Sequence, residues 1–263
     1  MDQGKTVLIT GASRGLGRTI ASYLAASGHH LILSDEEEKP LTATAEALRH
    51  YGGRVTWFAG DLLDASYREK LVGAAAERGS LDVLINAMPA DGEKLVGSLH
   101  SVSVCGLEEA LRARVIAPIG LTQAALPLLR QSQGLAVNIT ADLRQEVVAE
   151  VTCYGWAMDV LKTASKMMAE ELQDTGVGVV TVDPGPQRDE FRHANYPDEH
   201  SCSSLTPDAT IPFWAWIFEQ VPHAITGRHF RALDERWTSN SRLDAIRKQE
   251  EKVASKRAWL GVF

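Results

Sequence analysis

The stretch TVLITGASRGLG, Thr6–Gly17, decides the fold, because it joins a β-forming run to a glycine-rich turn near the start of the chain. Thr6–Thr10 is typical of a buried strand, and the apolar-periodic segment Arg18–Ser27 after the turn predicts a helix. Glycines in this position let the backbone approach a pyrophosphate, which would lie on the exposed N–H groups at the helix start. A turn that needs glycine only for steric reasons is the alternative, but the strand-turn-helix context favours the phosphate site.

Strand-like and helical segments alternate through the rest of the chain. Further strands are predicted at His30–Ser34, Val55–Ala59, Leu81–Asn86, Leu135–Thr140, Gly178–Val182 and around His229–Leu233, and helices at Pro40–Tyr51, Tyr67–Arg78, Leu107–Leu129, Tyr154–Gln173 and near Pro212–Gln220. This rhythm implies βαβ units. The predicted fold class is therefore α/β, a single-domain, Rossmann-like, doubly wound parallel sheet flanked by helices.

The expected domain covers residues 1–238, and residues 187–208 within it form a polar loop that we expect to cover the substrate. Residues 239–263 are charged and are expected to form a helical C-terminal tail. The tail ends in the apolar run Trp259–Phe263, which could make a subunit contact, because exposed apolar patches usually have partners.

Composition excludes several classes of function. The chain has 263 residues, a net charge of −7 and a pI of about 5.6, so no basic excess exists to neutralise nucleic-acid phosphates. No apolar run approaches the roughly 18 residues needed to cross a membrane. The three cysteines form no Cys-x-x-Cys motif, which favours a reduced, cytoplasmic setting. No metal-binding spacing is present, so no metal site is predicted.

Acidic residues follow the second predicted strand. Asp35 at its end can hydrogen-bond the adenosine ribose hydroxyls and would repel a 2′-phosphate. Glu36 strengthens the repulsion, and so do Glu37 and Glu38 unless they belong to a solvated loop. Arg14 has the opposite effect, because it could pair with such a phosphate. We therefore expect NAD rather than NADP, bound by Asp35 and by the turn residues Gly11, Ser13, Arg14, Gly15, Leu16 and Gly17.

These residues resemble the short-chain dehydrogenase/reductase family. Thr10–Gly17 matches its TGxxxGxG pattern, and Asn86-Ala87-Met88 resembles its Asn-Ala-Gly motif, with methionine in place of glycine. Asp61-Leu62 resembles the segment next to the adenine, and Pro184-Gly185 the pair near the nicotinamide. The resemblance covers roughly residues 4 to 235. It implies that Asp61, Leu62, Asn86, Ala87, Pro184 and Gly185 line the cofactor, that the substrate is a small molecule, and that the chain forms a homodimer or homotetramer.

The resemblance also implies four catalytic positions. In the family, a tyrosine exchanges a proton with the substrate oxygen, a lysine one helical turn later holds the nicotinamide ribose, a serine polarises the substrate oxygen, and an asparagine supports a proton relay. Tyr154 fits the tyrosine. Met158 stands at the lysine position, Ala141 at the serine position and Arg114 at the asparagine position.

Each substitution has a chemical consequence. Met158 brings no cation to favour a phenolate, so Tyr154 is expected to be a poor general base but could still donate a proton in carbonyl reduction. Ala141 removes a donor of a kind whose loss typically costs on the order of 10²–10³ in rate. Arg114 could bind a substrate carboxylate or phosphate, pair with Asp142, or point to solvent. Lys162, about 12 Å from Tyr154 along the helix, is too far to replace the lysine.

The sequence thus predicts a divergent NAD-dependent oxidoreductase that reduces a small carbonyl or enone, with Tyr154 as proton donor and Arg114 as a second candidate catalytic residue. Two alternatives stay open. One is a catalytically impaired pseudo-enzyme on the same scaffold, with an idle or weakly bound cofactor. The other is a redox-neutral enzyme of the dehydratase or cyclase type.

Overall fold

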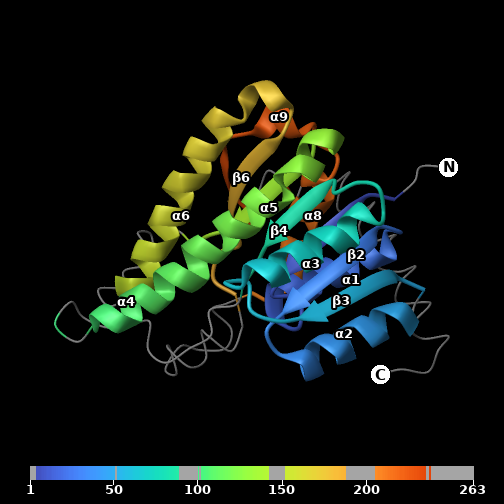
Figure 1. Ribbon diagram of the computed structural model, residues 1–263, viewed down its shortest axis with the longest axis horizontal. Coiled ribbons are helices and arrows are strands. Elements are labelled where there is room, and N and C mark those ends of the chain that lie inside the picture. Colours follow the sequence, from blue (N-terminus) through green and yellow to red (C-terminus); the bar gives the residue numbers. More distant parts are fainter. Residues whose placement is uncertain are drawn as a thin grey trace.

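The computed structural model describes residues 4–50, 52–88, 100, 102–141, 152–187, 205–234 and 237. These residues include a seven-stranded sheet in the order β3-β2-β1-β4-β5-β6-β7, with helices on both of its faces (Figure 1). Every neighbouring pair of strands is parallel. The strands are β1 (Thr6–Thr10), β2 (His30–Asp35), β3 (Arg54–Ala59), β4 (Val83–Asn86), β5 (Leu135–Ile139), β6 (Gly178–Asp183) and β7 (His229–Arg231). The predicted doubly wound parallel sheet is confirmed.

The helices form two outer layers. The hydrophobic cluster on one face of the sheet includes residues of α1 (Gly15–Ala26), α2 (Glu38–His50) and α8 (Ile211–Ile217). The cluster on the other face includes residues of α3 (Ala65–Ala76), α5 (Ala117–Ser132) and α6 (Thr152–Glu171). Three short elements that we did not predict are η3 (Gln173–Thr175), η4 (Pro207–Thr210) and α9 (Pro222–Ile225).

Successive strand residues alternate between the two hydrophobic clusters. In β1, Val7 and Ile9 belong to the cluster with α1, whereas Leu8 belongs to the cluster with α3 and α5. All three side chains are fully buried. A strand covered on both faces needs apolar side chains at every position, which is why this strand is a continuous apolar run rather than an alternating one.

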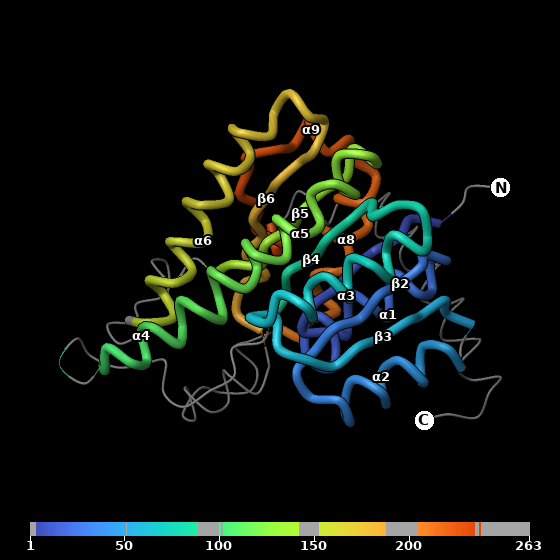
Figure 2. The backbone as a smooth tube through the Cα atoms, in the orientation of Figure 1, coloured from blue at the N-terminus to red at the C-terminus, as the bar shows by residue number. Residues whose placement is uncertain are grey.

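The longest predicted helix, Leu107–Leu129, is three segments in the structure. α4 (Val104–Leu111) leads into a π-helical turn, η1 (Arg112–Ile116), and then into α5. Figure 2 shows the three as one continuous rod that lies beside α6. Single π turns inside α-helices occur frequently at functional sites, and this one contains Arg114.

Aromatic side chains of α8 pack together with Trp237 in the core. Phe213 and Trp214 are fully buried, and the Phe213 ring lies 5.3 Å from the rings of Trp214 and Trp237. The predicted tail, 239–263, and residues 188–204 of the predicted substrate loop lie outside the described residues, so both stay predictions. No helix among the described residues is long and apolar enough to cross a membrane.

Candidate active site

The carboxyl ends of the strands bring most of the predicted site residues to one edge of the sheet. Thr10, at the end of β1, pairs with Ser34 of β2, and Asn86, at the end of β4, pairs with Asn138 of β5. The strand order reverses direction between β1 and β4. In open α/β sheets, ligands bind in the crevice outside the strand ends at such a switch point.

The glycine-rich turn after β1 has the geometry that a phosphate site requires. Gly11 and Gly15 have φ values of +62° and +50°, which favour glycine. A Cβ atom on Gly17 would lie 2.1 Å from the carbonyl oxygen of Gly11, so no side chain fits there. No side chain caps the α1 N-terminus, and the buried hydroxyl of Ser13 has no partner among the described residues. The turn therefore fits the pyrophosphate of a dinucleotide.

Asp35, at the end of β2, is 3% exposed, and its carboxylate is held by backbone amides. Oδ2 accepts a hydrogen bond from the Ser13 N–H at 3.0 Å, and Oδ1 accepts one from the Glu36 N–H at 2.8 Å. Near Asp35, Arg14 and Glu37 form an ion pair, in which Arg14 Nη2 lies 3.0 Å from Glu37 Oε1. Glu37 is thus paired with Arg14 rather than merely solvated.

A buried hydrogen-bond chain, which we call the polar chain, runs along one face of the sheet from α5 to α6. Asn86 Nδ2 donates to Thr122 Oγ1 at 3.4 Å and to Asn138 Oδ1 at 2.8 Å. Asn138 Nδ2 donates to Ser165 Oγ at 2.8 Å. All four side chains are at most 3% exposed. Sequence reasoning missed this chain, although an asparagine in each of two neighbouring buried strands was a usable signal.

The remaining predicted cofactor residues lie at other strand ends. Asp61 follows the edge strand β3 and is exposed, and its Oδ1 accepts a hydrogen bond from the Leu63 N–H at 2.7 Å. Leu62 is buried. The Ala87 N–H donates to Thr10 Oγ1 at 3.1 Å, which joins the start of the predicted motif after β4 to β1.

Pro184 and Gly185 follow β6. Gly185 has a φ value of +71°, and its N–H donates to Asp183 Oδ1 at 2.9 Å. No contact ties Asp61 or Pro184 to the glycine-rich turn among the interactions of the described residues, so their cofactor roles stay predictions.

The four catalytic positions lie on β5, η1 and α6. Tyr154 is half-buried near the start of α6, and Met158, one turn later, is 3% exposed. Ala141 is half-buried two residues after β5. Next to it, the hydroxyl of Thr140 is buried and has no partner within the described ranges.

Arg114 is directed into the protein. Its side chain is 5% exposed, so the alternative that it points to solvent is wrong. Nη1 donates a hydrogen bond to the carbonyl oxygen of Met88 at 2.6 Å, and Cζ lies 5.6 Å from the centroid of the Tyr154 ring. The possible partner Asp142 lies outside the described residues. Arg114 therefore bridges the segment after β4 and the candidate proton donor.

This arrangement corrects one expectation about the site. Met158 brings no charge to Tyr154, as the sequence predicted, but a cation reaches the tyrosine from η1 instead. A guanidinium over an aromatic face is favourable, and a nearby cation stabilises a phenolate relative to a phenol. No group of three or more histidine, cysteine, aspartate or glutamate residues in the described ranges could hold a metal ion.

Comparisons with known proteins agree with this geometry. The family model described as short chain dehydrogenase matches residues 5–200. The ketoacyl reductase HetN of a Nostoc species is 32% identical over 184 residues, which are 69% of this chain but only 63% of that relative. The oxidoreductase claN of Passalora fulva is 31% identical over 209 residues, 78% of this chain and 94% of claN.

A solved structure shares the fold closely. A crystal structure of a Shigella flexneri chain complexed with NADP has a TM-score of 0.80 to this protein at 26% identity, and the match covers 88% of this chain and 97% of that one. The family model, which spans most of the sequence, and the strand order of the sheet lead to the same conclusion. The chain belongs to the short chain dehydrogenase family, and is an oxidoreductase of that type.

Proposed function

We propose that the protein is an NAD-dependent reductase of a small carbonyl or enone compound, in which Tyr154 donates the proton to the substrate oxygen. The observation that carries this proposal is the guanidinium of Arg114, which lies 5.6 Å from the centroid of the Tyr154 ring. A tyrosine that gives up a proton acquires negative charge, and a fixed cation next to it stabilises that charge. The pair therefore supports proton donation without the lysine that the resemblance led us to expect.

The residues at the carboxyl edge would hold the cofactor. The uncapped start of α1 and the Ser13 hydroxyl would hold the pyrophosphate, and Asp35 the adenosine ribose. When bound, the nicotinamide supplies the hydride. The buried acid at residue 35 and the Arg14–Glu37 ion pair favour NAD. Because the Shigella flexneri chain was solved with NADP, membership of the family does not decide between the two cofactors.

Arg114 would hold a positive charge at a fixed position beside Tyr154. Its bond to the Met88 carbonyl fixes the guanidinium, so little reorganisation is needed when charge develops on Tyr154. Met158 is buried one helical turn after Tyr154 and brings no charged or polar group to that position. Ala141 offers no side-chain donor, so the substrate oxygen depends on Tyr154.

Steady-state kinetics with NADH and a panel of small ketones, diketones and enones test the proposal. We expect NADH oxidation with at least one class, and a loss of at least a hundredfold in kcat for Tyr154→Phe, within the range typical of removing a general acid, about 10²–10⁴. Arg114→Gln should also lower kcat, and Arg114→Lys, which keeps the charge, should recover part of that loss.

Three outcomes would contradict the proposal. Tight NADH binding without turnover across the panel would favour the pseudo-enzyme, and conversion of a substrate without NADH would favour the redox-neutral enzyme. Equal activity of the Tyr154→Phe variant and the wild type would remove the tyrosine from the mechanism. A normal thermal midpoint in each variant separates a chemical defect from an unfolded protein.

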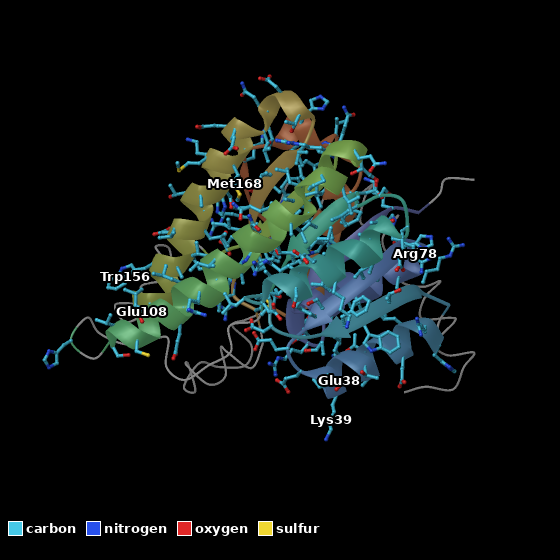
Figure 3. All side chains as sticks on the ribbon, in the orientation of Figure 1. Glu38, Lys39, Arg78, Glu108, Trp156 and Met168 are labelled. Atoms are coloured by element: carbon cyan, nitrogen blue, oxygen red, sulfur yellow. The ribbon has the colours of Figure 1, made fainter. Side chains whose placement is uncertain are left out.

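We further propose a homodimer or homotetramer that forms through η1 and α6. Ile116 is 54% exposed, and on α6 Trp156, Val160 and Met167 are 41%, 45% and 65% exposed. Figure 3 shows Trp156 on the outer side of α6. Apolar side chains gathered on one outer face usually have a partner. The cytoplasmic setting, inferred from the cysteines, also stays a prediction.

A further inference from the structure

A second concave site lies along the middle of α6, C-terminal to Tyr154, between that helix and the strands β6 and β7. It encloses about 560 Å³, and we call it the α6–β7 pocket. Its lining residues are Asp159, Lys162, Thr163, Ser165, Lys166, Val179, Thr181, Gly227, Arg228 and His229. Its volume falls in the range of small-molecule sites, about 300–1,000 Å³. None of the residues that we assign to the cofactor or to catalysis lines it.

Positive charge is concentrated in this pocket. Lys162, Lys166 and Arg228 line it, and Asp159 is the single carboxylate among the lining residues. None of the three cations makes an ion pair within the part of the chain that the structure describes. Lys162 and Lys166 stand one helical turn apart on α6, where like charges repel each other. In a chain with a net charge of −7, three cations around one hollow form an electropositive site.

The floor of the pocket adds neutral hydrogen-bonding groups. Ser165 and Thr181 are buried, at 2% and 4% exposure. Thr181 Oγ1 lies 2.9 Å from His229 Nδ1, and Ser165 Oγ accepts a hydrogen bond from Asn138 and donates one to the carbonyl oxygen of Leu161 at 2.7 Å. Gly227, which has a φ value of +74°, lies at the rim of the pocket, in the turn between α9 and β7. Because these hydroxyl groups already have partners, the donors available to a ligand are Lys162, Lys166 and Arg228, which suit an anion with several acceptor oxygens.

We propose that the α6–β7 pocket binds a small organic molecule that carries a phosphate group. Arginine matches phosphate through its planar fork of donors, and lysine binds it as a point charge. The combined positive charge of three cations suits a phosphate dianion better than the single negative charge of one carboxylate. The volume exceeds what a free phosphate fills, so the remaining space, which Val179 and Gly227 line, would hold the organic part of the ligand. The site is separate from the dinucleotide turn, and its occupancy does not depend on the reaction proposed above.

Calorimetric titrations of the full chain with ribose 5-phosphate and with inorganic phosphate test this site, with ionic strength held constant by chloride. The experiment is repeated with saturating NADH, which keeps the probes out of the dinucleotide turn. We expect ribose 5-phosphate to bind in both cases, and more tightly than inorganic phosphate. The double variant Lys162→Gln/Lys166→Gln and the single variant Arg228→Gln should each weaken its binding at least tenfold.

Lys39→Gln is the matched control, because it removes an exposed lysine on α2, which Figure 3 shows on the far side of the molecule from α6. It should bind ribose 5-phosphate like the wild type. The proposal is overturned if neither probe binds, if NADH abolishes the binding, or if the control weakens it as much as the pocket variants do. Equal affinity for the two probes would leave the organic part without a role and would overturn that part of the proposal. Thermal midpoints without ligand show that each variant is folded.

Discussion

Removing the charge of Glu37 is expected to move cofactor preference toward NADPH while leaving stability unchanged. Glu37 Oε1 lies 3.0 Å from Arg14 Nη2, and the two side chains are 57% and 28% exposed. An ion pair so accessible to water contributes about 0–1 kcal/mol to folding, because solvent screens it. Glu37→Gln should therefore shift the thermal midpoint by no more than a few degrees.

The effect on NADPH binding should be larger. Once Glu37 is neutral, Arg14 can donate to a 2′-phosphate, and a hydrogen bond to a charged group contributes about 1.5–3 kcal/mol. Part of this gain is lost because Asp35 still repels the phosphate. We expect a net gain of about 1–2 kcal/mol, which is roughly a 5- to 30-fold lower Kd for NADPH. The Kd for NADH should change less than twofold, because a ribose hydroxyl at that position carries no charge.

Fluorescence titration with NADH and NADPH measures both constants, at low salt and at 1 M salt, where the Debye length falls to about 3 Å and the gain should shrink. Glu38→Gln is the matched control, because it removes the same charge one residue later without touching Arg14. An equal gain in both variants would attribute the effect to net charge alone. A gain that persists in the double variant Arg14→Gln/Glu37→Gln would refute the role of the arginine.

Two further predictions concern stability. Asn138→Ala breaks both hydrogen bonds that Asn138 makes in the polar chain. Each buried partner left unsatisfied costs about 1–3 kcal/mol, so the thermal midpoint should fall by roughly 5–15 °C. The fall should be smaller in Ser165→Ala, which breaks only one of these two bonds. Equal midpoints in calorimetry would show that the chain does not stabilise the sheet. Burial, aided by the charge of Lys5, lowers the pKa of His29. The unfolded chain therefore binds more protons below about pH 6.5, so the free energy of unfolding should decrease as the pH falls through that range. Urea titrations should show a shallower decrease in His29→Gln, and an unchanged slope would contradict this assignment.

Most of the fold followed from local sequence patterns. The central strands are short apolar runs with both faces covered, and the positions of all seven strands could be predicted to within two residues at either end. The parallel order followed from the alternation with helices. The glycine-rich turn was recognisable because its chemistry is local: the strand, the turn and the helix are consecutive in the chain.

The arrangement around Tyr154 was harder to predict, because its contacts are not local. The sequence identified Met158 and Arg114 as unusual residues, but it did not show that the guanidinium reaches the tyrosine ring. That contact depends on how η1 and α6 pack together, and η1 itself is not apparent from hydrophobic periodicity. The polar chain was missed for the same reason, since its four side chains come from two strands and two helices.

The π-helical turn η1 also affects how this helix can be aligned with others. Its hydrogen bonds span one residue more than those of an α-helix, and each α-helical residue turns the chain by about 100°. The segments α4 and α5 therefore do not share one helical register, and a face assigned by counting from Leu107 is displaced by one residue beyond Ile116. Deleting one residue between Arg112 and Ile116 would restore a plain α-helix, but it would rotate α4 away from its contacts with α6. An aligned relative without this π turn should therefore need a one-residue gap inside the helix, a place where gaps are normally avoided.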